Sequence, residues 1–232
     1  MAPQSTNPDG IPPRVAGLLT FVGSLIVTSA LVFTILLVMA FAPFGDLLAI
    51  DPQLPWRLSR ASGTVAYLLL TGSMVWGLLL SSRIVKELTP PPLMMSLHTF
   101  ISWLALGAAF FHAYMLLFDS YYHYTLLDLL VPFFGPYRPG WVGLGIIGMY
   151  FGFITSASFG WRSWLGQKAW RALHYLTFGV FVLVTFHGIF SGTDSNNLGM
   201  QLMYLGSVLL VLFLINYRLL SSKTNERKSG RP

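Results

Sequence analysis

The sequence predicts an all-α, polytopic membrane protein with six transmembrane helices. Hydrophobic residues make up 54% of its 232 residues and charged residues only 9%, a composition too apolar for an ordinary soluble domain. The chain also contains six apolar runs that lack Asp, Glu, Lys and Arg. Each run is long enough for a helix to cross the ~30 Å hydrocarbon layer of a bilayer.

The first half of the chain contains three of these runs. Residues 1–14 include four prolines and are expected to form a short disordered lead. The first span, 15–42, is about twice as long as a secretory h-region, so we expect a retained helix rather than a cleaved signal peptide. The second span is 61–82. The third is 88–118, where the prolines at 90–92 can stand only at the start of a helix.

The second half contains the other three runs. The longest connection, 119–139, is rich in tyrosine and phenylalanine, as segments at the membrane–water interface are. The fourth span is 140–161, the fifth is 172–193 and the sixth is 198–217. Residues 218–232 form a basic tail that is too short to fold as a domain, so 15–217 is the membrane domain.

Charge sets the expected orientation. All but three of the 14 lysines and arginines lie on the side of the bilayer that six spans assign to both termini, the exceptions being Arg57, Arg60 and Arg138. The positive-inside rule therefore places both termini in the cytoplasm, with the inner membrane of a bacterial cell as the expected location. It also explains the net charge of +6 without nucleic-acid binding.

Four of the five histidines lie at paired depths in the third and fifth spans. His98 and His112 are 14 residues apart, and His174 and His187 are 13 apart, which is about 20 Å along a helix. Because the two spans run in the same direction, His98 lies level with His174 and His112 level with His187. Ionisable groups inside a membrane are costly and usually functional.

The chemistry of these pairs points to haem. The chain has no cysteine, which excludes iron–sulfur clusters and thiolate sites and leaves imidazole as the available soft ligand. Two haem b groups would each take two axial imidazoles from facing helices: His98 with His174 on the inner side, and His112 with His187 on the outer side. A copper or zinc site is the alternative, but its ligands would have to converge within ~2–2.3 Å of one ion.

The spacing within the fifth span needs a local irregularity. On a regular helix His112 lies about 40° from His98 around the axis, which is one face. His187 lies about 140° from His174, which is not. We expect either an irregularity such as a π-bulge in the fifth span, or helix tilt and histidine rotamers that make up the difference.

Cationic side chains near each face are candidates to bind haem propionates. Those candidates are Arg83, Lys86 and Arg171 for the inner haem and Arg57, Arg60 and Arg138 for the outer haem. Topology and lipid-headgroup anchoring would explain the same residues. The fifth histidine, His123, is either an interfacial residue or part of an acceptor-side surface that supplies protons or binds an acceptor.

A glycine motif in the fourth span has a structural interpretation. Gly143, Gly145 and Gly148 match G-x-G-x-x-G, the dinucleotide fingerprint, but no strand precedes them and they lie within a span. We expect these glycines to allow close helix packing.

Three stretches of the sequence resemble the ferric reductase-like transmembrane family, which includes the membrane haem domain of ferric reductases, NADPH oxidases and the methionine sulfoxide reductase haem subunit. They are Arg-Ala-Ser-Gly-Thr-Val-Ala-Tyr at 60–67, the stretch 98–119, and Trp-Arg-Ala-Leu-His at 170–174 leading to His-Gly-Ile-Phe-Ser-Gly-Thr-Asp at 187–194. The likeness covers roughly residues 57–217. It implies transmembrane electron transfer with His98, His112, His174 and His187 as axial ligands.

The chain departs from the oxidases in ending soon after the sixth span, where those relatives continue into a flavin and nicotinamide domain. The expected electron donor is therefore separate, either a flavoprotein or a membrane quinol, and the acceptor lies on the opposite side of the bilayer. Two alternatives stay open. The chain could be a quinone-linked haem anchor of a larger redox complex, or a non-redox transporter or assembly protein with structural histidines.

Overall fold

The computed structural model describes residues 51–81 and 91–229, with side chains placed for 51–81 and 94–221. All regular secondary structure in this part of the chain is helical, and five of the helices are long and apolar enough to cross a membrane. This is the architecture of a multi-pass membrane protein. The first expected span, 15–42, the lead at 1–14 and the residues Arg83 and Lys86 lie outside the described residues.

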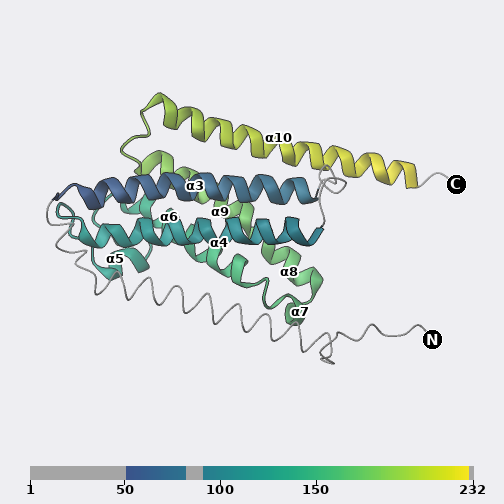
Figure 1. Ribbon diagram of the computed structural model, residues 1–232, viewed down its shortest axis with the longest axis horizontal. Helices are drawn as coiled ribbons and strands as arrows, with labels where there is room; N and C mark the ends of the chain where they lie inside the picture. Colours follow the sequence, from purple (N-terminus) through teal and green to yellow (C-terminus); the bar gives the residue numbers. More distant parts are fainter. Residues whose placement is uncertain (1–50, 82–90, 230–232) are drawn as a thin grey trace. The chain divides into compact units, whose positions relative to one another are not determined.

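The helices follow the expected order. They are α3 (Leu54–Ser81), α4 (Pro91–Met115), η1 (Leu116–Phe118), α5 (Leu126–Leu130), α6 (Pro139–Ala157), α7 (Arg162–Leu165), α8 (Gln167–His174), α9 (Leu176–Ser191) and α10 (Leu198–Ser229). Helix α3 packs along α4, α6 packs along α9, and α10 packs against α3 (Figure 1). Helix α4 also contacts α6, and α3 also contacts α9.

The helix starts reflect local chemistry. Helix α4 begins at Pro91, as expected, because a proline at the first turn removes only an N–H that has no partner there. Helix α3 begins at Leu54, seven residues before the expected start at residue 61, and so contains Arg57 and Arg60. Arginine is a good helix former, and these two lie in the first turns, where their side chains reach polar surroundings.

The C-terminal tail differs from expectation. We expected the sixth span to end near Tyr217 and a basic tail to follow it, and the structure shows that α10 includes the tail as far as Ser229. Residues 218–229 contain no glycine or proline and are rich in Leu, Lys, Arg and Glu, which favour helix. Hydrophobicity marks where the membrane ends, whereas a helix can continue beyond it wherever its residues favour helix.

The fifth span contains the expected irregularity, although it is not a π-bulge. The span is divided into α8 and α9 at Tyr175, directly after His174. The N–H of Tyr175 is shared between the carbonyls of Arg171 and Ala172, both at 3.2 Å, and the N–H of Phe178 donates to the carbonyl of Tyr175 at 3.1 Å. Bonds of the i→i−3 kind overwind a helix to about three residues per turn.

The apolar core lies beside the histidines rather than between them. Its buried residues come from α3, α9 and α10, namely Tyr67, Met74, Leu78, Phe181, Tyr204, Val211 and Leu214. Tyr67 packs edge-on against Tyr204, with ring centroids 4.9 Å apart, and its hydroxyl lies 3.3 Å from the hydroxyl of Thr185. This core fixes α3 against α9 and leaves the space around the histidines unfilled.

Candidate cofactor-binding site

Two pairs of histidines face each other across the bundle. The ring centroids of His98 (α4) and His174 (end of α8) are 6.2 Å apart, and those of His112 (α4) and His187 (α9) are 6.1 Å apart. These are the same pairs that the depths in the sequence predict. We refer to His98 and His174 as the Arg171 pair, because Arg171 comes shortly before His174 in the sequence. We refer to His112 and His187 as the Arg60 pair, because Arg60 follows Ser59, whose carbonyl faces His112.

Backbone carbonyls orient both rings of the Arg60 pair. Nδ1 of His112 lies 2.7 Å from the carbonyl oxygen of Ser59 on α3, and Nδ1 of His187 lies 3.0 Å from that of Trp141 on α6. A carbonyl oxygen can only accept, so each Nδ1 carries the proton and donates it. The lone pair of each Nε2 atom is then free, and a metal ion would bind to this atom.

The Arg171 pair has weaker partners. Nδ1 of His98 lies 3.4 Å from the hydroxyl of Ser73, which in turn bonds to the hydroxyl of Ser102 at 2.7 Å. The Ser102 hydroxyl donates back to the carbonyl of His98 at 2.8 Å. Nδ1 of His174 is buried and has no hydrogen-bond partner among the described residues, and the same holds for Nε1 of Trp170, whose ring stacks on that of His174 at 5.1 Å.

Glycines make room for three of the four rings. A Cβ atom on Gly63 would lie 2.8 Å from Nδ1 of His112, and one on Gly145 would lie 2.7 Å from Nδ1 of His187. A Cβ on Gly77 would lie 3.2 Å from Cε1 of His98. The first two distances are too short for any side chain. The backbones of α3 and α6 thus press directly on the rings and limit how they can turn.

A cavity of about 580 Å³ runs past both histidine pairs. All four histidines line it, and so do Gly63, Gly77 and Gly145. Its charged lining residues are Arg60, Arg171, Arg218 and Asp194. The volume falls within the range of cofactor pockets in proteins, and the lining is mainly apolar with few polar groups, as is usual for such pockets.

The residues present fit an ion held between two imidazoles. Imidazole nitrogens bind first-row metals at about 2 Å, so two ligands on opposite sides of one ion place their ring centroids about 6 Å apart. Aromatic rings that merely pack together also show such distances. The Nδ1 hydrogen bonds make the difference, because they fix the tautomer in which Nε2 is free to bind.

The number of metal-ligating side chains at each site indicates which kind of metal group it could hold. No cluster of three or more His, Cys, Asp or Glu side chains that could hold an ion occurs in the described part of the chain. Structural and catalytic zinc sites take three or four protein ligands. A group that already supplies four equatorial ligands needs only two more from the protein, and haem is such a group.

The glycine motif of α6 packs closely, as expected. A Cβ on Gly148 would lie 2.8 Å from Cγ2 of Val184 on α9, and one on Gly152 would lie 3.4 Å from Cδ2 of Leu106 on α4. Gly145 faces His187, as described above. The motif therefore brings α6 close to α9 and to the histidines.

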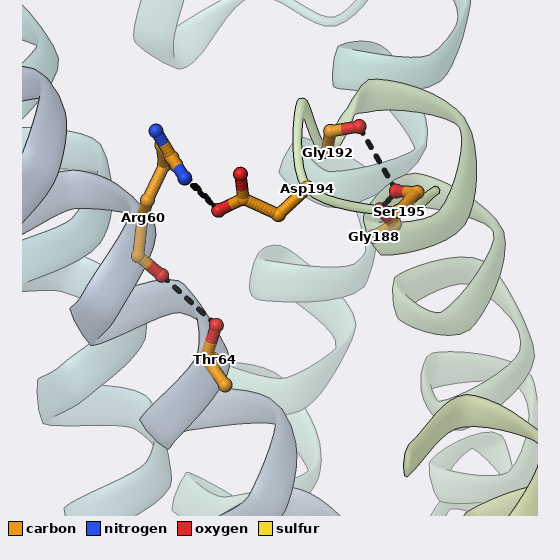
Figure 2. A network of polar contacts seen from close by, with 6 residues as sticks. All are labelled: Arg60, Thr64, Gly188, Gly192, Asp194 and Ser195. Atoms are coloured by element: carbon orange, nitrogen blue, oxygen red, sulfur yellow. Dashed lines mark hydrogen bonds and ion pairs between the residues drawn. The ribbon is translucent and has the colours of Figure 1, made fainter. Parts of the chain in front are cut away.

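An ion pair joins Arg60 and Asp194, two of the charged residues that line the cavity. The guanidinium of Arg60 on α3 donates to a carboxylate oxygen of Asp194, from Nε at 2.7 Å and also from Nη2. Figure 2 shows the two side chains pointing toward each other across the gap between α3 and the segment after α9. The Ser195 hydroxyl donates to the carbonyls of Gly188 and Gly192 at 3.0 and 2.9 Å, and so holds the segment that carries Asp194.

The described propionate candidates differ in whether they line the cavity. Arg171 and Arg60 line the cavity, whereas Arg57 and Arg138 are not among its lining residues. Arg57 donates to the side chain of Gln53 at 2.7 Å, and Arg138 donates to the carbonyl of Phe190. Arg218 lines the cavity although its sequence position gave no reason to select it.

His123 lies on the surface of the connection between α4 and α6. It is exposed and has a φ of 52°, and it does not line the cavity. Its neighbours Tyr122 and Tyr124 belong to an aromatic cluster with Trp56 and Tyr137, in which ring centroids lie 5.0 to 6.3 Å apart. Burial, followed by the nearby Asp119 carboxylate, raises the pKa of the Tyr124 phenol, so this tyrosine stays protonated.

Sequence reasoning missed the residues that hold the rings, although a signal for them exists. Helix α3 contains Ser59 and Gly63, and the same Ser-x-x-x-Gly pattern recurs 14 residues later as Ser73 and Gly77. The same interval separates His112 from His98 on the antiparallel helix α4. Each Ser-x-x-x-Gly unit therefore meets one histidine, the serine near Nδ1 and the glycine against the ring.

No family model matches this chain, and no curated protein or solved structure is significantly similar to it. The function is therefore inferred from the residues of this chain and their geometry.

Proposed function

We propose that this chain is a six-span membrane b-type cytochrome, similar to the ferric reductase-like proteins, that moves single electrons across the bilayer through two bis-histidine haems. The observation that carries the proposal is the pair of facing imidazole sites, at 6.2 and 6.1 Å between ring centroids, with Nδ1 of both rings of the Arg60 pair bonded to backbone carbonyls. The span at 15–42 and the cytoplasmic location of both termini belong to this proposal.

In this function the haems supply reversible one-electron chemistry, and the chain supplies ligands, orientation and insulation. His98 and His174 would hold one haem, and His112 and His187 the other. Gly63, Gly77 and Gly145 leave the space that the rings occupy, and the apolar helices keep water from the site. Arg60, Arg171 and Arg218 line the cavity and could neutralise haem propionates.

Two histidines per iron leave no vacant coordination position, so an acceptor would receive electrons at a haem edge rather than on the metal. The donor would be a separate flavoprotein or a membrane quinol on the cytoplasmic side, and the acceptor would lie on the opposite side. Whether the chain acts alone or as a quinone-linked anchor of a larger complex depends on partners outside this chain.

The test is an absorption spectrum of the purified full chain, reduced minus oxidised, with the haem-to-protein ratio. We expect a b-type signal and two haems per chain. His112→Ala and His187→Ala should each leave one haem, and His123→Ala, the matched control outside the cavity, should leave two. A chain without haem, or one that retains two haems in both the His112 and His187 variants, would contradict the proposal and favour a non-redox membrane protein.

A further inference from the structure

A groove distinct from the histidine cavity lies between the end of α9 and the start of α10. It encloses about 750 Å³, and its wall is formed by the last turn of α9, the connection to α10, the first turns of α10 and Arg138 at the start of α6. The ends of membrane-spanning helices lie at the membrane–water interface. The groove, which we call the α9–α10 groove, therefore opens at the depth of the lipid headgroups.

The lining of the α9–α10 groove changes from polar to apolar along α10. Asn196 precedes the helix, Gln201 lies in its first turn, and Leu205 and Val208 follow. At ~1.5 Å per residue, Leu205 and Val208 lie about 6 and 10 Å deeper than Gln201. These three residues share one face of the helix, because they are four and seven positions apart. The groove thus combines polar side chains at headgroup depth with an apolar floor at acyl-chain depth.

The groove also contains an unbalanced positive charge. Arg138 is the only charged residue among the described residues that line it, and its side chain is exposed. The guanidinium donates to the carbonyl of Phe190 and lies over the ring of Tyr137, 5.2 Å from the centroid. These contacts hold the guanidinium at the groove, and its remaining N–H groups are suited to an anionic oxygen.

We propose that the α9–α10 groove binds an anionic phospholipid. The phosphate would accept hydrogen bonds from Arg138 and from the amides of Asn196 and Gln201, and an acyl chain would lie along Leu205 and Val208. A site for free phosphate would not need this apolar floor. Leu205 is also more than half exposed, so an acyl chain there would contact both the groove and the surrounding bilayer. The inference does not depend on whether haem is bound.

The test is native mass spectrometry of the purified full chain in neutral detergent, with phosphatidylglycerol or with phosphatidylcholine of the same acyl chains. We expect the first phosphatidylglycerol to bind more tightly than the first phosphatidylcholine. Arg138→Gln removes the charge and should weaken phosphatidylglycerol binding about five-fold. Arg57→Gln is the matched control, because Arg57 is also exposed and does not line the groove, and it should leave the affinity unchanged.

A second pair of variants tests the apolar floor. Leu205→Trp fills part of the groove and should also weaken phosphatidylglycerol binding. Leu202→Trp should not, because Leu202 is similarly exposed, at 58% against 56%, but does not line the groove. Both leucines lie outside the buried core, so these variants test the inference even if Arg138→Gln does not fold.

Four outcomes would overturn the inference. They are equal binding of the two lipids, an equal loss of affinity in Arg57→Gln, displacement of phosphatidylglycerol by inorganic phosphate without any effect of Leu205→Trp, and a dimer that Leu205→Trp dissociates. The third would show a site for phosphate alone, and the fourth would show that a second copy of the chain covers the groove.

Discussion

Each imidazole of the Arg60 pair is restrained on two sides, by a backbone acceptor at Nδ1 and by a glycine against the ring. Ser59 and Gly63 do this for His112, and Trp141 and Gly145 do it for His187. Ligands to a metal need their rings oriented before the metal arrives, and such outer partners typically contribute 10-fold to 100-fold in metal affinity.

Gly63→Ala should therefore disturb the site. The new methyl group would meet the ring of His112 at 2.8 Å from Nδ1, and this ring cannot retreat without losing its bond to the Ser59 carbonyl. We expect the haem content of the purified chain to fall from two to about one, measured by the reduced-minus-oxidised spectrum and haem extraction.

Gly72→Ala on the same helix is the control, because a Cβ there meets nothing within 4 Å. It should keep both haems and stabilise α3 by about 0.5–1 kcal/mol, since alanine favours helix more than glycine does. Equal haem content in the two variants would show that the close approach of α3 to the ring is unimportant.

At the scale of elements, the short helix α5 is held by a reciprocal cap. The backbone N–H and the hydroxyl of Thr125 both donate to Oδ2 of Asp128 at 2.7 Å, and the N–H of Asp128 donates to the Thr125 hydroxyl at 3.4 Å. The two hydrogen bonds from Thr125 lower the pKa of the Asp128 carboxyl. Such a box orders the start of a helix that is too short to be stable alone.

The cap predicts an acid-sensitive α5. A carboxyl whose pKa is lower in the folded state stabilises that state fully above its unfolded pKa of about 3.9 and loses the effect as pH falls through the folded value. The protection factors of the α5 amides, which compare the observed exchange rate with the intrinsic rate at the same pH, should therefore fall below about pH 4. In Asp128→Asn these protection factors should already be lower at neutral pH and should not fall further in acid. A variant that keeps the wild-type profile would mean that another group is responsible.

The Arg60–Asp194 pair connects α3 to the segment between α9 and α10. Its side chains are 39% and 42% exposed, so water and salt screen it, and such pairs contribute roughly 0–1 kcal/mol. Asp194→Asn should lower the unfolding free energy by less than about 1 kcal/mol in low salt, and the difference should shrink in 1 M salt. Thermal unfolding of detergent-solubilised protein measures this.

A double-mutant cycle isolates the pair. In an Arg60→Gln background, Asp194→Asn should have almost no further effect, because its partner is already absent. A loss that stays the same in high salt, or that adds fully to that of Arg60→Gln, would mean that Asp194 acts through the backbone turn held by Ser195 rather than through the ion pair.

At the scale of the whole molecule, the overwound turn at Tyr175 reconciles the 14-residue and 13-residue spacings. Each residue of a three-per-turn segment rotates about 20° more than a residue of an α-helix. A π-bulge would underwind the helix and rotate His187 the wrong way. The turn thus supplies part of the missing rotation between His174 and His187.

Insertions that change the two spacings should have opposite outcomes. One alanine inserted after Tyr175 restores a 14-residue spacing that a regular helix can accommodate, so the variant should retain two haems. One alanine inserted after Ala108 in α4 rotates His112 by about 100° relative to His98 and should cost at least one haem. Loss of haem in the first variant and not in the second would show that the overwound turn has no part in pairing the rings.

The sequence was sufficient for properties that depend on distance along a single helix. Five of the expected spans, the start of α4 at Pro91 and the matching levels of the histidines follow from apolar length and from a fixed rise per residue. Hydrophobicity indicates the extent of the sixth span but not the end of α10, because a helix can continue beyond the membrane wherever its residues favour it.

Rotation and lateral contact were decided only by the tertiary structure. No local pattern assigns the Ser59 carbonyl to His112 or joins Arg60 to Asp194, which is 134 residues away in the chain. Nor does any local pattern predict that Nδ1 of His174 has no acceptor among the described residues. Depth in a membrane adds up residue by residue along one helix, so the sequence alone determined it. The direction in which a side chain faces, and what it meets there, depends on how several helices pack at once, and for that reason only the assembled bundle could determine it.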